Sequence, residues 1–507
     1  MSESRTKNAE RNIAFGLINR VATLILPFIS RTIILYLLGD AYVGVGTLFT
    51  SVLSFLSLAE LGVGSAVVYS MYKPIAEKDY ELVGALLGYY RRLYRWIGTA
   101  ILAVGLAILP LIPVLTHKEA PEGVDIYILY CIYLVNSVIS YFFAGYRQSL
   151  LSAHQRTDVI SGIATVIAFF VRIVEIVVLI LTRNFYFYAF VPVAGTLLTN
   201  AIIAAATRRM YPAITCRGVV PNEIRKDINK KITGLFGTKL YSTVIHQADA
   251  VVISACFGLA MAAIYGNYHV IFNAVSGFVT ILFTSVTAGI GNKLVTDPLN
   301  SNFLLFRRLR FANEWIVCWC CVCFACLYEP VMELWAGKER CLGSGFAVLM
   351  SAYFFLSQIQ RTMFVFKDAA GVWEQDKKRP YASMLVNLVG NLLLVRVAGV
   401  YGVLCATLLA YCVSLPWMNA TLFRYVFHRD SIENLISILK CFLVTAAIGG
   451  ITYVGCLWCR SGVIGVAERF VICCIVPNAF LCICMHQKEE FRFWKSFLQR
   501  MIGCKAA

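Results

Sequence analysis

The chain has 507 residues, of which 59% are hydrophobic and only 14% charged, and its formal net charge at pH 7 is +17. The apolar share exceeds that of soluble domains, and apolar stretches long enough to cross a bilayer recur along the whole chain, which excludes a soluble protein. A net charge this positive is typical of nucleic-acid binding in soluble proteins, but here the charges lie in short loops between apolar runs, which excludes that partner.

The predicted elements begin with a retained first span, because residues 1–12 are polar and basic and the apolar run from Ile13 has no small-residue cleavage site. We predict an all-α polytopic membrane protein of about fourteen transmembrane helices. The expected spans are 13–38, 43–72, 96–116, 124–147, 157–181, 184–208, 232–257, 260–294, 311–333, 344–366, 380–398, 400–424, 435–459 and 463–485. Glycine-containing breaks at 38–40, 118–123 and 257–258 separate neighbouring spans.

Lysine and arginine are distributed unevenly between alternate loops. About 34 fall on the side that both termini share, about 6 on the other side and about 5 inside spans, which predicts that both termini are cytoplasmic. The richest inner loops are 73–95, 208–231, 361–379 and the tail 488–505. We interpret these loop charges as solvated groups that attract anionic lipid headgroups.

The organisation indicates a duplicated bundle. A shift of about 219 residues places Arg20 on Lys239 and Gly39 on Gly258, so the first and seventh spans are candidate counterparts. We therefore predict that the chain has four parts. They are an N-terminal lobe of six helices at 1–210, a basic amphipathic linker at 211–231, a C-terminal lobe of six helices at 232–430, and the extension 431–507. The fourth part contains two extra transmembrane helices and a basic cytoplasmic tail.

Ionisable residues inside spans are costly and usually face a bundle interior, so each is a candidate functional residue. The cationic candidates for a central cavity are Arg20, Arg31, Arg172, Lys239 and His246. Arginine suits phosphate because its planar guanidinium makes paired hydrogen bonds, and this favours a phosphate-bearing cargo. Arg172 can equally pair with Glu175, three residues further along its own helix.

Two acids and five helix-loosening residues complete the candidate site. Glu60 and Asp249 either neutralise a neighbouring cation or bind a coupling ion such as a proton or sodium. The hinge candidates, for which close helix packing is the alternative, are Pro27, Gly62, Gly64, Gly289 and Gly291.

Nineteen cysteines lie mostly inside apolar segments, and Cys318, Cys320, Cys321, Cys323 and Cys326 form one stripe. We interpret this stripe as small apolar packing, because a thiolate metal site among lipid or packed helices would carry a heavy desolvation cost. We find no Gly-rich phosphate loop, nucleotide fingerprint or His/Cys metal spacing, and expect no cofactor, no metal and no ATP hydrolysis.

The opening of the chain resembles a known family. The segments 8–12, 26–32, 37–39 and 60–66 (NAERN, LPFISRT, LLG and ELGVGSA) are similar to those of the polysaccharide transporters of the MOP superfamily, and within it to the Wzx-like flippases of lipid-linked oligosaccharides. The resemblance in span pattern covers essentially the full length, whereas the residue motifs lie in the first hundred positions.

The resemblance implies a V-shaped pair of lobes with about six helices each, two additional C-terminal helices, and alternating access to a cationic cavity. The implied cargo is an undecaprenyl-diphosphate-linked oligosaccharide repeat unit of O-antigen, capsule or exopolysaccharide, flipped from the inner to the outer leaflet, with an ion gradient as one driving force. Membrane lipids and a polysaccharide polymerase are the implied partners.

Four alternatives remain. A peptidoglycan-precursor flippase would share the helix count and the basic lumen. A multidrug exporter of the same superfamily is disfavoured because a cationic cavity repels organic cations. A membrane enzyme acting on polyprenyl sugars is disfavoured by the short outer loops, since such enzymes are expected to present a large outer loop or an acidic pair. A channel or scaffold would not need cations near the middle of both lobes.

Overall fold

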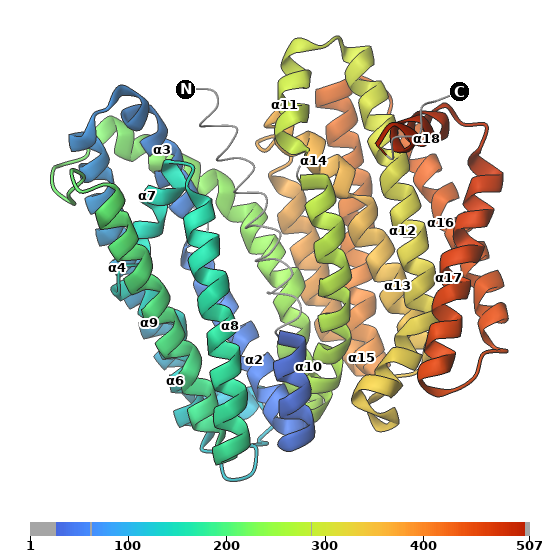
Figure 1. Cartoon of the computed structure of the whole chain (residues 1–507), viewed down its shortest axis with the longest axis horizontal. Coiled ribbons are helices and arrows are strands. Elements are labelled where there is room, and N and C mark those ends of the chain that lie inside the picture. The colour runs from blue at the N-terminus through green and yellow to red at the C-terminus, as the bar shows by residue number, and fades with distance from the viewer. Residues whose placement is uncertain (1–26, 61–62, 285, 502–507) are drawn as a thin grey trace. The chain divides into compact units, whose positions relative to one another are not determined.

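The computed structural model describes residues 27–60, 63–284 and 286–501, and within these ranges the chain is helical apart from short turns and loops (Figure 1). Of the described helices, eight are long and apolar enough to cross a membrane, or nine if one bent pair counts as a single span. The protein is therefore a multi-pass membrane protein, as the sequence predicts. The count of about fourteen spans stays a prediction.

The chain divides into two compact units, 1–266 and 267–507. In unit 1 the helices are Pro27–Leu37, α2 (Asp40–Leu56), α3 (Val63–Glu77), α4 (Tyr80–Ile108), α5 (Ile112–Leu115), α6 (Ile126–Phe142), α7 (Gln148–Ala153), α8 (Thr157–Thr182), α9 (Phe185–Met210) and the greater part of α10 (Asn222–Thr284). Within this unit α9 packs against both α6 and α8, and α4 packs against α3 and α6.

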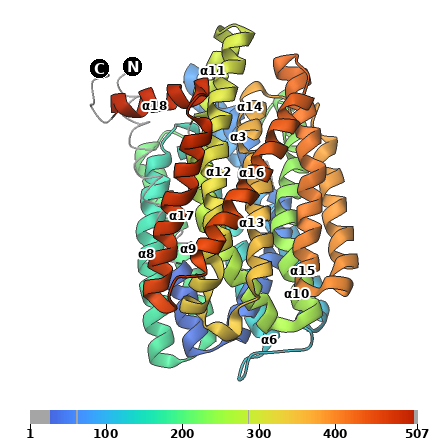
Figure 2. The ribbon, with the colours of Figure 1, turned by 90° about the vertical axis from the view of Figure 1, so that its right-hand side faces the viewer.

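Unit 2 holds the end of α10 followed by α11 (Thr287–Thr296), α12 (Leu299–Ala336), α13 (Ser344–Ile359), α14 (Arg361–Ala370), α15 (Lys378–Leu422), α16 (Ile432–Cys456), α17 (Gly462–Met485) and α18 (Glu489–Met501). Its central helix is α12, which packs against α13, α16, α17 and α18 (Figure 2). The amphipathic helix α18 is fastened to α12 by ion pairs from Arg307 to Glu490 and from Arg308 to Glu489.

The predicted glycine breaks are confirmed. Gly39 (φ 99°, ψ −177°) precedes α2, and Gly258 (φ 82°, ψ −179°) interrupts α10. This backbone region is open to glycine almost alone, so both positions need that residue. The two glycines that the proposed repeat aligns thus share one backbone conformation. Gly399 interrupts α15 in the same manner, between two stretches that the sequence analysis had separated.

Three predicted boundaries are wrong. The expected span 43–72 ends as an α-helix at Leu56 and continues as a 3₁₀ turn over Ser57–Glu60, where the Ser57 hydroxyl donates to the Leu53 carbonyl oxygen and competes with the helical ladder. The expected span 344–366 breaks at Gln360. The expected span 124–147 ends as helix α6 at Phe142, and the next helical segment, Gly145–Ala153, is bent by 50° from α6.

The expected inner loop 73–95 is also wrong, because α4 begins at Tyr80. The Asp79 side chain accepts a hydrogen bond from the Leu82 backbone N–H (2.9 Å) and caps the helix. The buried face of this helix consists of apolar and aromatic side chains, among them Val83, Leu86, Tyr90 and Tyr94. This face was not recognised from the sequence because three arginines, Arg91, Arg92 and Arg95, lower the average hydropathy of the segment. In the predicted linker, helix α10 begins at Asn222, so only 211–221 is irregular.

Helices α2 and α10 approach backbone to backbone inside unit 1. A Cβ atom on Gly44 would lie only 1.9 Å from the Leu259 carbonyl oxygen. We predict that Gly44→Ala separates the two helices and lowers the free energy of unfolding by about 1–3 kcal/mol or more. Thermal unfolding in detergent measures the loss.

The matched control is Gly450→Ala on α16, where nothing lies within 4 Å of the added Cβ. Because alanine has the higher helix propensity, this variant should unfold at the unaltered temperature or slightly above it. Equal destabilisation of the two variants would contradict the close approach at Gly44.

Candidate functional site

An ion pair lies inside unit 1, on α8. Arg172 Nη1 is 2.6 Å from Glu175 Oε2, three residues along the same helix, so the pairing considered from sequence is present. The Glu175 side chain is fully buried, whereas 30% of the Arg172 side chain remains exposed. The other carboxylate oxygen, Glu175 Oε1, is buried with no hydrogen-bond partner among the described residues. Arg172 can thus be reached by a ligand, while the acid behind it cannot.

The helical period places this pair away from the apolar surface of α8. The exposed apolar side chains Phe170, Val174, Val177 and Leu181 lie opposite Arg172 at offsets of about 140–200°, and exposed Phe169, Ile173 and Ile180 lie at about 60–100°. The buried side chains Glu175 and Leu179 lie within about 60° of Arg172. An apolar surface of this kind suits lipid. Arg172 therefore points toward the helices of its own unit.

Two tyrosines from other helices complete what we call the arginine cluster: Arg31, Tyr133, Arg172, Glu175 and Tyr188. The Tyr188 side chain, on α9, lies close enough to both Arg172 and Arg31 to interact with each of them electrostatically. Tyr133, on α6, interacts electrostatically with both members of the ion pair. The structure thus brings together two of the arginines that the sequence analysis singled out separately.

Arg31 is held by two further elements. Its Nη1 donates to Thr47 Oγ1 on α2 (3.2 Å), and its Nη2 donates to the Ala263 carbonyl oxygen on α10 (3.0 Å). Gly266 leaves room for this guanidinium, because a Cβ there would lie 2.4 Å from Arg31 Nη2. The residues of the arginine cluster and the partners of Arg31 therefore come from six helices of unit 1, which are Pro27–Leu37, α2, α6, α8, α9 and α10.

Glu60 is surrounded by tyrosines. Its two carboxylate oxygens accept hydrogen bonds from Tyr94 on α4 (2.8 Å) and Tyr141 on α6 (2.5 Å). Among the described contacts its partners are hydroxyl groups and not a cation. These bonds fasten the 3₁₀ turn that ends α2 to two neighbouring helices.

The other predicted site residues are scattered or lie outside the description. Asp249 is buried on α10 and accepts a hydrogen bond from Tyr265 (2.8 Å), whereas His246 is exposed on the same helix. Arg20 lies outside the described residues, and so does the side chain of Lys239, whose backbone belongs to α10.

The hinge candidates differ in their surroundings. Pro27 begins the first described helix, and Gly62 lies outside the described residues. A Cβ on Gly64 would touch the Tyr90 hydroxyl at 3.0 Å, which indicates close packing at that position. Gly289 and Gly291, on α11, have open space or only a distant contact beside them.

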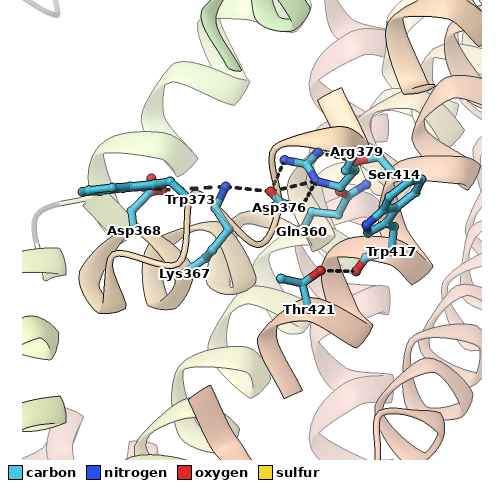
Figure 3. A network of polar contacts seen from close by, with 9 residues as sticks. All are labelled: Gln360, Lys367, Asp368, Trp373, Asp376, Arg379, Ser414, Trp417 and Thr421. Atoms are coloured by element: carbon cyan, nitrogen blue, oxygen red, sulfur yellow. Dashed lines mark hydrogen bonds and ion pairs between the residues drawn. The ribbon is translucent and has the colours of Figure 1, made fainter. Parts of the chain in front are cut away.

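The sequence analysis missed a buried charge network in unit 2, at the turn between α14 and α15 (Figure 3). Asp376 accepts hydrogen bonds from Lys367 Nζ (2.9 Å) and from Arg379 (2.8 Å), and all three side chains are at most 2% exposed. Arg379 also donates to Ser414 on α15, which donates to Gln360. The interpretation of the 361–379 charges as solvated is therefore wrong for Lys367 and Arg379. The i, i+3 spacing of Asp376 and Arg379 was the available signal.

Removing the central acid of this network should leave two buried cations unpaired. We predict that Asp376→Asn lowers the free energy of unfolding by about 3–5 kcal/mol, the usual effect of breaking a buried ion pair. Denaturant-induced unfolding in mixed micelles measures the change.

The same substitution at Asp368 is the control, because its side chain is 51% exposed and lies 3.9 Å from Lys367. Asp368→Asn should cost at most about 1 kcal/mol. If Asp376→Asn were equally mild, the network would not stabilise the α14–α15 turn.

Unit 2 also contains an apolar groove of about 470 Å³ between α12, α13 and α16. Small side chains line much of it, among them Ala325, Gly345, Ala352, Gly449 and Gly450. The groove suits a flexible hydrocarbon more than a polar ligand.

Long apolar helices that enclose ion pairs and carboxylates define a multi-pass helical membrane protein. No protein-family model and no curated protein matches the sequence. Solved structures do match, and each similarity below concerns the fold.

The fold is similar to that of the lipid II flippase MurJ in its inward closed conformation, with 16% identity, a TM-score of 0.67, and coverage of 94% of this chain and 99% of that one. It is also similar to a multidrug resistance MATE family transporter of the MOP superfamily in its inward-facing conformation (16% identity, TM-score 0.59, coverage 80% and 98%). A third similar structure is a MOP superfamily transporter from Pyrococcus furiosus (14% identity, TM-score 0.52, coverage 84% and 97%), for which reverse polarity of the binding pocket suggests a different function. The chain therefore has the fold of MOP superfamily transporters.

Proposed function

We propose that the protein flips an undecaprenyl-diphosphate-linked oligosaccharide repeat unit from the inner to the outer leaflet of a bacterial cytoplasmic membrane by alternating access. The observation that carries this proposal is the arginine cluster, in which Arg31 and Arg172 both lie near Tyr188 inside one unit of a transporter fold. A guanidinium in a low-dielectric interior binds phosphate oxygens more strongly than it would in water.

The remaining features fit a lipid-linked anion. The apolar groove of unit 2, beside α16, has the lining that a polyprenyl chain requires. The arginine cluster of unit 1 has the charge that a diphosphate requires. With the basic loops cytoplasmic, the substrate is loaded from the cytoplasmic leaflet, where repeat units are assembled. A polymerase that consumes the repeat unit on the outer face would draw the reaction forward.

The alternatives differ in the charge of their cargo. A multidrug exporter of organic cations is disfavoured, because two guanidinium groups repel such a cargo. A peptidoglycan-precursor flippase is supported by the same fold and the same diphosphate chemistry. We favour the oligosaccharide because of the motifs in the first hundred residues, and a direct comparison of cargoes decides between the two.

We further propose that Glu175 regulates how tightly the diphosphate is held. Its carboxylate already occupies Arg172 Nη1, so an incoming phosphate competes with it. Such competition keeps binding moderate, which turnover requires, because a fully neutralising site would retain its cargo. A proton taken up by Glu175 would release Arg172 and couple binding to the proton gradient. Glu60 and Asp249 stay further coupling candidates.

The first experiment reconstitutes the full chain in proteoliposomes that contain a lipid-diphosphate-linked oligosaccharide and follows the accessibility of the sugar on each leaflet. We predict that Arg31→Gln and Arg172→Gln each lower the flipping rate at least roughly tenfold, since each removes a charge-assisted contact worth about 1.5–3 kcal/mol.

Arg183→Gln is the matched control, because this arginine lies in the exposed turn after α8, away from the arginine cluster, and should flip at the unaltered rate. Lipid II and an organic cation serve as alternative cargoes. Equal flipping rates for all variants would show that the arginine cluster does not take part in transport. Faster flipping of lipid II than of the oligosaccharide would show that the cargo is the peptidoglycan precursor.

A second prediction concerns Glu175→Gln, which removes the competing charge but keeps the side-chain size. We expect the diphosphate lipid to bind about tenfold more tightly and to be released more slowly, so that affinity rises while turnover falls. Binding in detergent and flipping in proteoliposomes measure the two effects. Glu77→Gln, at an exposed ion pair with Lys73, should change neither. Weaker binding by Glu175→Gln would show that the acid only positions Arg172.

A further inference from the structure

Three cysteines from three helices converge inside unit 2. Cys326 lies on α12, Cys456 ends α16 and Cys473 lies on α17, and their Sγ atoms are all within 4.8 Å of one another. The three side chains are at most 4% exposed. Their helices pack against one another, and the view turned by 90° about the vertical axis shows α12, α16 and α17 beside one another (Figure 2).

The neighbouring sequence adds two further sulfur atoms in a regular spacing. Cys323 and Cys326 are separated by two residues, and so are Cys456 and Cys459. Cys323 lies close enough to Cys473 to interact with it electrostatically, but its sulfur is not one of the three that all lie within 4.8 Å of one another. Both pairs have the C-x₂-C spacing of metal-binding cysteines, so the expectation that the chain has no His/Cys metal spacing is wrong. The 129 residues between the two pairs concealed their proximity.

The geometry suits a metal ion bound by three sulfurs. With metal–sulfur bonds of about 2.3 Å, three ligands arranged in a plane around an ion stand about 4.0 Å apart. The observed sulfurs therefore need to move by less than about 1 Å. Among the described residues, the potential ligand atoms of this group are the three cysteine sulfurs. Sulfur ligands are soft, and soft ligands select Cu(I) and related ions.

The surroundings favour an ion that accepts three ligands. Val322, Ile448 and Leu481 belong to the same buried cluster as the three cysteines, and such apolar side chains leave a water molecule few partners. Zn²⁺ in structural sites takes four ligands, whereas Cu(I) is satisfied by fewer. The Arg469 guanidinium is close enough to act electrostatically on Cys326, and its positive charge opposes the negative charge of bound thiolates.

We propose that Cys326, Cys456 and Cys473 bind one soft monovalent d¹⁰ ion of the Cu(I) class. Each thiol loses its proton on binding, so that one cation and three thiols give a trithiolate complex of charge −2 and three released protons. The bound ion fastens the end of α16 and the middle of α17 to α12. It stabilises the C-terminal helix pair independently of any transported cargo.

The test uses the reduced, full-length protein in detergent without oxygen, titrated with Cu(I) in the presence of a competing Cu(I) chelator. Cys326→Ser, Cys456→Ser and Cys473→Ser should each bind about one ion per chain fewer than the unaltered protein. The matched control is Cys482→Ser, an exposed cysteine on α17, which should bind as many as the unaltered chain. The corresponding alanine variants repeat the comparison without a buried hydroxyl.

Two further readouts separate a built site from scattered thiol binding. X-ray absorption should show a shell of sulfur alone around the copper that the three variants lose, and Cu(I) should raise the unfolding temperature of the unaltered and control chains but not of the three variants. Equal copper uptake by all variants would overturn the proposal, as would nitrogen or oxygen in the metal shell. Retention of Zn(II) in preference to Cu(I) by the same three residues would overturn the assignment to a monovalent ion.

Discussion

A polar group inside a hydrocarbon layer must find its partner within the protein, because no water is present to bond it. This constraint explains why the interior charges of this chain are fastened between helices. Arg31 donates to Thr47 on α2 and to a carbonyl oxygen of α10, and Glu60 accepts from tyrosines on α4 and α6. Each such group fixes the distance between elements that apolar packing alone would leave free to slide. The helical breaks follow the same constraint, since the 3₁₀ turn at Glu60 is held by the bonds to that residue.

The sequence predicted well the features that depend on local chemistry. Gly39 and Gly258 were identified from turn composition, and both adopt a backbone conformation that other residues disfavour. Apolar length identified the membrane helices, and the i, i+3 spacing of Arg172 and Glu175 identified their ion pair. In each case the physical cause acts within a few residues along the chain.

Features that depend on distant segments were not predictable in this way. Hydropathy averages placed Lys367 and Arg379 in a solvated loop, although both side chains are buried and form ion pairs with Asp376. The start of α4 was predicted too late in the chain, because three arginines reduce the average hydropathy of the segment that contains its apolar face. Tyr188 was not considered, although it lies near both Arg31 and Arg172, because a tyrosine in an apolar span carries no periodic signal. The cysteines of α12 were interpreted without those of α16 and α17, since only tertiary packing brings the three helices together.

The two charge clusters of this protein differ in a manner that bears on their roles. In the network of unit 2 the acid and both cations are almost completely enclosed, so any change of partner would expose an unpaired charge at a cost of several kcal/mol. Such a network has one stable arrangement and suits a fixed turn. In the arginine cluster of unit 1, the acid is enclosed but 30% of the Arg172 side chain is not, so Arg172 can exchange its carboxylate for another anion without first being buried alone. The proposed transport function needs both kinds of cluster, because a cargo site must change partners while the helices around it keep theirs.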